Sequence, residues 1–132
     1  MKIKNLELFP LINFLEKVDM SAKASRARTK LVKRLRNWGD EYTESQKQIV
    51  LENGGVVDEN GSVSFIGHEE NIPKTSAERT ELSLETVNVS EDFDGQFKSL
   101  KTFFEDWDGV VSAVDASAYD KLLDILEDEE EK

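Results

Sequence analysis

The chain has 132 residues, no cysteine, one histidine and a formal net charge of −11. This length suits one domain with one modest core. The lack of cysteine excludes a disulfide, a thiolate zinc site and a cysteine nucleophile, and no run approaches the ~18 apolar residues of a membrane-spanning helix.

Charge is divided unequally along the chain. Residues 1–39 hold ten Lys/Arg against three acids, a net charge of +7, whereas residues 40–132 hold seven Lys/Arg against 25 acids, a net charge of −18. An acidic body repels nucleic acid and attracts basic surfaces by long-range steering. The plainer alternative is that acidity keeps a small protein soluble.

The chain begins with a short segment and a first helix. Residues 2–4 are expected to form a strand or simply an arm. The helix should begin at Asn5 as N-cap and end near Val18. Its apolar face is made by four residues at helical spacing, namely Leu8, Leu11, Ile12 and Leu15.

One long amphipathic helix is predicted over residues 21–52, with Asp19 or Ser21 as its N-cap. An apolar stripe at steps of three and four runs from Ala24 to Ile49. Gly39, in the middle, costs about 1 kcal/mol relative to alanine, so the helix could bend or break there. We prefer one continuous helix because the stripe keeps its phase across this glycine.

The long helix should stop at residues 53–55, Asn-Gly-Gly. A β-hairpin is predicted next, with strands at residues 56–57 and 62–66. Its Asn60-Gly61 pair favours a type I′ turn, and the alternation in the second strand indicates one buried face.

A loop is predicted over residues 67–74, followed by a short helix capped by Thr75 or Ser76. Alternation over residues 84–89 then predicts a third strand. This strand could pair with the hairpin.

Two further helices are predicted in the last third of the chain. The first opens at residues 90–92, ends at Asp108-Gly109, and has an apolar face made by Phe93, Phe97, Leu100, Phe104 and Trp107. Asp115 caps the second, which should turn inward Tyr119, Leu122, Leu123 and Leu126.

The expected fold class is α+β, mainly helical, with one long central helix and a small antiparallel sheet made of the hairpin plus one strand. Residues 1–126 should form a single globular domain. Residues 127–132 should form an acidic C-terminal tail that frays.

The long helix carries a run of seven Lys/Arg between residues 23 and 36, without an acid between them. Four residues share one face beside the apolar stripe and form the basic flank: Lys23, Arg26, Lys30 and Lys33. This flank could contact phosphates, or it could pair with the acidic half of the same chain or of a partner subunit. We favour pairing, because the charge of −18 elsewhere repels nucleic acid and no aromatic residue interleaves the run.

Several carboxylates cluster late in the chain. Those proposed as a partner-binding acidic face are Glu91, Asp92, Asp94, Glu105, Asp106 and Asp108. Spaced carboxylates can imitate a phosphate backbone and occupy the Arg/Lys groove of a nucleic-acid-binding protein. The alternative, which the sequence alone favours, is a solvated acidic surface.

No catalytic, cofactor or metal site is predicted, and we expect that the protein is not an enzyme. His68 is the only histidine and should be exposed in a polar loop. Asp58, Asn60 and Glu69 resemble part of a calcium loop, but Val63 stands where that loop requires glycine. No Gly-rich phosphate loop is present.

Several segments carry a resemblance: KIKN at the start, PLINFLEK at residues 10–17, KASRARTKLVKRL at 23–35, VVDENGSVSF at 56–65 and SAYDKLLDILED at 117–128. Together they resemble a domain-of-unknown-function family of small proteins from phages and prophages of Gram-positive bacteria. The resemblance implies a phage origin and a setting in the cytoplasm of a bacterial host cell. It supplies no established active residues.

Three functions compete on these grounds. The preferred one is an acidic inhibitor of a host nucleic-acid-binding protein, anti-CRISPR-like and of the DNA-mimic type. A phage tail-assembly or structural accessory protein that self-associates is the first alternative, and a nucleic-acid-binding regulator acting through the basic flank is the second. The expected partner is therefore a basic host protein, with direct nucleic-acid contact less expected, no membrane, and a homo-oligomer left open.

Overall fold

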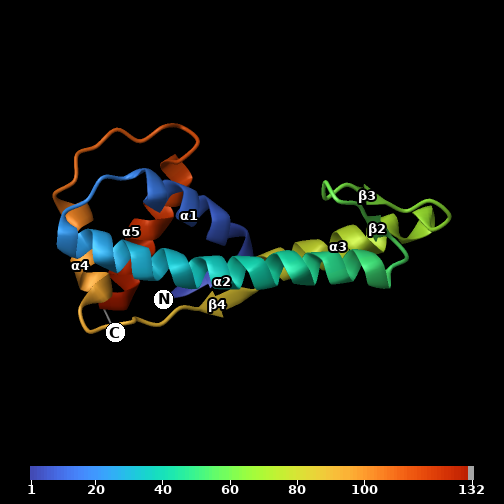
Figure 1. Ribbon diagram of the computed structural model, residues 1–132, viewed down its shortest axis with the longest axis horizontal. Coiled ribbons are helices and arrows are strands. Elements are labelled where there is room, and N and C mark those ends of the chain that lie inside the picture. Colours follow the sequence, from blue (N-terminus) through green and yellow to red (C-terminus); the bar gives the residue numbers. More distant parts are fainter. Residues whose placement is uncertain (131–132) are drawn as a thin grey trace.

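Helix α2, Ala22–Glu52, runs the length of the molecule in the computed structural model, which describes residues 1–130. Figure 1 shows α1, α4 and α5 gathered around its first half, while only α3 and a hairpin accompany its second half. We call these parts the head (residues 1–38 and 86–130) and the arm (residues 39–85). The elements are mainly helical with two small antiparallel sheets, which confirms the predicted α+β class.

The long helix is continuous through Gly39, as predicted. The ring of Phe9, in α1 (Leu8–Lys17), lies on the backbone of this glycine. A Cβ atom at Gly39 would lie 2.8 Å from Cζ of Phe9, so the missing side chain allows α1 to approach α2. The helix ends at Glu52 with Asn53 as its C-cap, and Gly54 follows with a φ of +86°, which suits the left-handed residue after a C-cap.

The core lies in the head, where α1, α2, α4 (Gln96–Glu105) and α5 (Ala116–Glu130) pack on one another. An aromatic group joins three of these helices, with ring centroids 5.4–6.1 Å apart. Its members are Phe14, Phe104, Trp107 and Tyr119. These spacings are typical of favourable edge-to-face and tilted aromatic contacts.

The third predicted strand forms as β4, Thr86–Asn88, but it pairs with β1, Lys2–Lys4. The pairing is antiparallel, with Ile3 opposite Val87. The suggested pairing with the hairpin is therefore wrong. Helix α3 returns the chain from the arm to the head, so β4 lies far from the hairpin and beside the N-terminal strand.

The predicted hairpin forms from β2, Val56–Val57, and β3, Val63–Ser64. The type I′ turn is wrong, because only Gly61 has a positive φ, of +81°, and this turn type needs two. Instead, the Asp58 carboxylate accepts the N–H groups of Asn60 and Ser62, at 2.8 and 2.9 Å. The expected buried face over residues 62–66 is also wrong, because only Phe65 is half-buried.

Several helix boundaries differ from the predictions. Helix α1 begins at Leu8, because Asn5–Glu7 form a 3-10 helix, and α4 ends at Glu105 rather than at residues 108–109. Helix α3 spans Ile72–Leu84 and begins earlier than expected, because Pro73 suits the first turn, and Glu69–Asn71 before it is a 3-10 helix. Helix α4 begins later, after Gly95 with a φ of +83°. Helix α5 continues to Glu130, so the predicted acidic tail is helical from residue 127 to that point, and residues 131–132 lie outside the described part.

Candidate partner-binding surfaces

The basic flank lies on the head half of α2 and is partly engaged within the chain. The guanidinium of Arg26 lies 4.3 Å from the ring centroid of Phe93, a cation–π contact. Lys23, Lys30 and Lys33 are exposed and make no ion pair with any residue in 1–130. The flank is therefore neither fully paired nor fully free.

The neighbouring arginines of the basic run hold the head together. Arg34, which is outside the flank, pairs with Asp92 at 2.8 Å. Within residues 1–130, no member of the flank itself makes the expected ion pair with the acidic half of the chain. Arg28 donates to the backbone carbonyls of Leu15, at 3.3 Å, and Val18, at the open end of α1. These carbonyls have no partner within their helix, so a cation suits this position. Arg36 pairs with Glu16, also in α1.

Asp92 is fixed from two sides. The hydrogen bond from Arg34 and the charge of that guanidinium lower the pKa of Asp92, and the charges of Lys30 and Lys33 lower it further. Its backbone N–H donates to Oε1 of Gln96 at 2.6 Å. Gln96 is fully buried, and its Nε2 donates to the carbonyl of Ala27 at 3.0 Å. The segment before α4 is thereby bound to α2.

The six residues of the predicted acidic face form two groups at opposite ends of α4. Three precede the helix and three end or follow it, and the ten residues of α4 separate them by about 15 Å. Lys98 and Lys101 lie between the groups in sequence, and Lys101 is 3.7 Å from Glu105. Glu91 accepts the N–H of Phe97 at 2.9 Å. The members that make no ion pair within residues 1–130 and no side-chain hydrogen bond there are Asp94, Asp106 and Asp108.

A cavity of about 630 Å³ lies between the start of α2 and the side of α4. Its lining includes the lysines Lys23 and Lys98 and the carboxylates of Asp106 and Asp108, beside Trp107. Because cations and carboxylates are balanced in this lining, it prefers neither an anion nor a cation. The cavity therefore has no electrostatic signature of a particular ligand.

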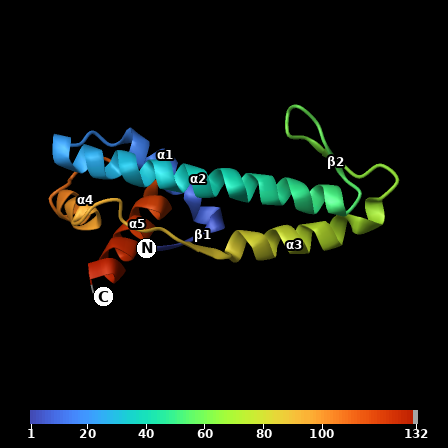
Figure 2. The ribbon, with the colours of Figure 1, turned by 60° about the horizontal axis from the view of Figure 1, so that its bottom comes forward.

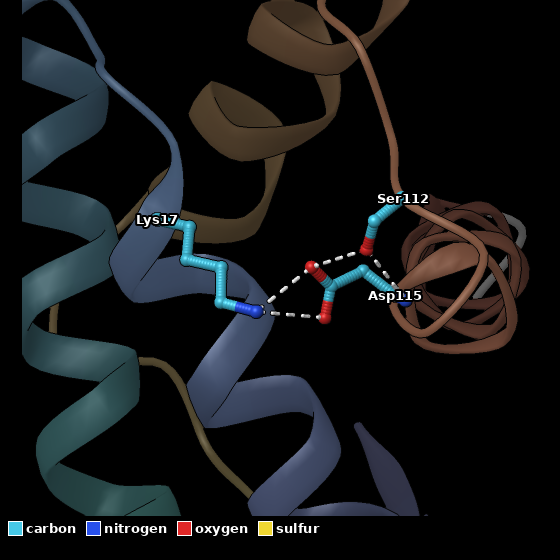
Figure 3. Close-up of polar contacts among 3 residues, drawn as sticks. All are labelled: Lys17, Ser112 and Asp115. Atoms are coloured by element: carbon cyan, nitrogen blue, oxygen red, sulfur yellow. Dashed lines mark hydrogen bonds and ion pairs between the residues drawn. The ribbon is translucent and has the colours of Figure 1, made fainter.

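One polar cluster ties α1 to α5, and Figure 3 shows its three members. Nζ of Lys17 lies 3.0 and 3.3 Å from the two carboxylate oxygens of Asp115. The hydroxyl of Ser112 donates to the same carboxylate at 3.2 Å and accepts the Asp115 N–H at 3.2 Å. Asp115 immediately precedes α5, as predicted, and both of its carboxylate oxygens accept hydrogen bonds. These contacts explain how the start of α5 is attached to α1. The cluster includes no histidine.

The outer side of α5 presents a row of carboxylates, which the sequence identified only as an acidic stretch from Asp124 onward and not as a helical row. Its members are exposed and follow one another at steps of four, three and one: Asp120, Asp124, Glu127 and Asp128. The helical spacing in the sequence is the signal that could have identified this row.

The end of the arm is a second surface that was not predicted. We define the arm tip as residues 48–73, which contain no Lys or Arg and five acids: Glu52, Asp58, Glu59, Glu69 and Glu70. Five large apolar side chains are exposed there: Leu51, Val56, Val63, Ile66 and Ile72. His68 is exposed at the same place, as predicted, with its ring on Gly54.

Comparison with protein-family models, with curated proteins and with solved structures finds no match for this chain. Within residues 1–130, no helix combines the length and the apolar character needed to cross a membrane. In the same part of the chain, no three His, Asp or Glu side chains come together to hold a metal ion.

Proposed function

We propose that this chain is a non-enzymatic acidic binding protein that occupies the basic, nucleic-acid-binding surface of a protein partner. The observation that carries the proposal is the charge left exposed after the chain has paired internally. Among the basic residues that follow α2, Lys74, Lys101 and Lys121 each pair with a glutamate. Most carboxylates of the arm and of α5 remain in solvent.

The rigidity of the helices supports this proposal. Along α5, exposed carboxylates recur about once per turn, or about every 6 Å along the helix axis. A fixed row of negative charges steers association with a cleft lined by Lys and Arg and favours such a partner over acidic ones. Nucleic acid is the natural ligand of such clefts, and the proposed protein would compete with it.

The family resemblance supplies the setting for the proposal. A phage-encoded protein acts in the cytoplasm of a bacterial host, so the proposed partner is a host protein. A CRISPR nuclease is one example, because it holds nucleic acid in a positively charged channel.

Direct nucleic-acid binding through the basic flank is less favoured. Arg26 makes a cation–π contact with Phe93, and Arg34, from the same basic run, makes an ion pair with Asp92. Only the three lysines of the flank are left for phosphates, and the surrounding carboxylates oppose the approach of a polyanion.

Two variants with opposite charge changes test the proposal. The chain is immobilised, a partner is captured from a nuclease-treated lysate of a Gram-positive host, and its affinity is measured after purification at about 0.1 M and about 0.5 M salt. We expect a basic nucleic-acid-binding protein whose affinity falls at least tenfold at the higher salt. Neutralising the α5 row (Asp120→Asn, Asp124→Asn, Glu127→Gln, Asp128→Asn) should weaken binding.

The second variant, with the opposite charge change, removes the three exposed lysines of the flank: Lys23→Ser, Lys30→Ser and Lys33→Ser. It should bind at least as well as the parent, because it is more acidic. A loss of binding in this variant, or a gel shift of DNA by the parent chain alone that the variant abolishes, would contradict the proposal and favour the regulator.

A self-associating structural or tail-assembly protein is the second candidate. It is favoured by the opposite charges at the two ends of α2, because the basic flank of one copy could meet the acidic arm tip of another. Such a head-to-tail contact is heterologous and would build a ring or an open filament, depending on the rotation between copies. Light scattering tests it directly, and a strictly monomeric chain would exclude it.

A further inference from the structure

We propose that the arm tip is the part of the molecule that enters the partner, and that it occupies a cleft with apolar walls and a Lys/Arg-rich rim. Its exposed apolar side chains form the wedge, and the carboxylates at the hairpin turn, Glu59, and near the hairpin base, Glu69 and Glu70, form the collar. This inference rests on the proposed function and locates its main contact. The partner class is a basic nucleic-acid-binding protein.

The arm tip is held in one conformation by contacts at its base. The ring of Phe65 packs so closely on Gly55 that a Cβ there would lie 2.9 Å from the ring. The side chain of Asn53 donates to the carbonyl of Ile49, and that of Asn71 donates to the carbonyl of Asn53, both at 2.8 Å. These contacts fix the tip to both helices of the arm. A pre-ordered element loses little conformational entropy on binding.

The hairpin exposes apolar side chains on both of its faces. Val57 and Val63 are opposite one another and share a face, while Val56, 62% exposed, lies on the other. Ile66, just after β3, is 88% exposed. Figure 2 shows the hairpin standing away from the helix pair, so both faces can be reached. A projecting ribbon that is apolar on both sides fits a cleft better than a flat surface.

The exposed apolar side chains of the arm tip need an explanation because they lie close together in the sequence. Single exposed apolar residues are normal on protein surfaces, but a group of them within a polar rim is typical of an interaction site. Here five lie within 26 residues that contain five acids and no Lys or Arg. An apolar centre surrounded by polar residues is also the arrangement of binding hot spots.

The negative charge of the arm tip indicates which kind of partner it can bind. Glu59 lies in the turn of the hairpin, and Glu69 and Glu70 lie near its base. Hydrogen bonds from the backbone N–H groups of Glu69 itself and Gly67 lower the pKa of the Glu69 carboxyl, so this group stays ionised. Like charges disfavour contact with the tip of a second copy, with nucleic acid and with an anionic membrane surface. A basic protein surface is complementary.

An apolar substitution with a matched control tests the wedge. The tip variant is Val56→Ser with Ile66→Ser. The control is Val110→Ser with Val114→Ser, which changes two valines that are 97% and 87% exposed in the connector before α5. Affinity is measured for the purified basic partner captured by the parent chain. We expect a loss of at least tenfold for the tip variant and less than twofold for the control, with unchanged circular dichroism for both.

A charge-reversal pair tests the collar. Glu59→Lys with Glu70→Lys should slow association and weaken binding at least tenfold. Asp19→Lys with Asn13→Lys and Asn37→Lys, all at exposed positions, makes the same change of net charge in the head and should have a much smaller effect. An equal or larger loss for the head variant would show that net charge, or the head itself, governs binding, and it would overturn the wedge while leaving the proposed function standing.

The remaining outcomes separate the two proposals. If the parent binds a basic partner and the apolar tip variant binds equally well, the wedge is wrong and the proposed function survives. If the parent binds no basic nucleic-acid-binding protein, both are wrong. If the parent is an oligomer that the tip variant converts to a monomer, the occupant is a second copy, and the wedge is overturned.

Discussion

Gly39 and Phe9 meet where α1 lies against the middle of α2. The sequence analysis considered this glycine as a place where the helix could break, at a cost of about 1 kcal/mol. In the structure it is a contact site, because the aromatic ring lies where a side chain would project. The same residue therefore weakens the helix locally and allows two helices to pack closely.

A double-mutant cycle measures the energetic coupling between the glycine and the aromatic ring. In the background of Phe9→Ala, Gly39→Ala should stabilise the protein by about 1 kcal/mol, because only the gain in helix propensity remains. In the parent, the same substitution should gain clearly less, because the ring must move. The free energies come from urea unfolding of the four proteins. Equal effects in the two backgrounds would show that the ring and the glycine are not coupled.

Asp92 gives a pH-dependent prediction at the same scale. Its pKa is lowered from the ordinary value of 3.8, mainly by the hydrogen bond from Arg34, so its charged form stabilises the fold. A lowered pKa in the folded state gives a contribution that is present above the unfolded-state pKa and lost as the pH falls through the folded-state pKa.

Asp92→Asn should therefore destabilise the protein at neutral pH, and the difference from the parent should shrink below about pH 4. Urea unfolding of both proteins from about pH 7 to about pH 3 measures it. Asp94→Asn, which removes a neighbouring carboxyl without an ion pair in residues 1–130, is the control for the loss of a negative charge before α4. A constant difference for Asp92→Asn at all pH values would contradict the assigned ion pair.

At the scale of elements, α4 is attached to α2 by a buried amide. Gln96 lies in the first turn of α4 and is fully buried, although the sequence analysis assigned it no role. Its two polar atoms are both used, one by the carbonyl of Ala27 and one by the N–H of Asp92. A single polar residue beside an apolar stripe carries no signal for such a role, because the carbonyl of Ala27 comes from a distant part of the chain.

Gln96→Leu should destabilise the protein by about 1–3 kcal/mol, because the N–H of Asp92 loses its acceptor in a partly buried place. Chemical unfolding provides the measurement. Gln48→Leu, at an exposed position of the long helix α2, should change the stability by less than about 0.5 kcal/mol. Similar effects of the two substitutions would argue against the buried bridge.

Local sequence patterns predicted where helices and strands form better than they predicted which elements lie beside one another. The continuous α2 followed from a stripe that keeps its phase, and the aromatic stripe of α4 packs inward as expected. The partner of β4 could not be read from the sequence, because alternation indicates a half-buried strand without saying what lies beside it. For the same reason, the carboxylates of the acidic face were identified but not their separation, which depends on where α4 begins after Gly95.

At the scale of the whole molecule, stability and proposed binding lie in different places. The apolar core cluster consists of head residues, whereas Thr75 is the one buried residue of α3. The arm is a pair of helices with a thin apolar contact and a mainly acidic surface. A long arm of this kind can present a binding tip far from the core.

This division predicts unequal amide exchange. Amides of α3 should exchange at least tenfold faster than those of α1, because local opening of the arm exposes little apolar surface. Hydrogen exchange followed by mass spectrometry or NMR measures both. Equal protection of the two helices would mean that arm and head unfold as one cooperative unit.

We propose that the acidic protein takes the place of nucleic acid on its partner. The most direct measurement is fluorescence anisotropy of a labelled DNA duplex bound to the purified partner, titrated with the parent chain. The account predicts that the chain displaces the duplex completely and competitively, and that Val56→Ser with Ile66→Ser shifts the curve at least tenfold to higher concentration. A stable ternary complex of partner, duplex and chain would contradict it.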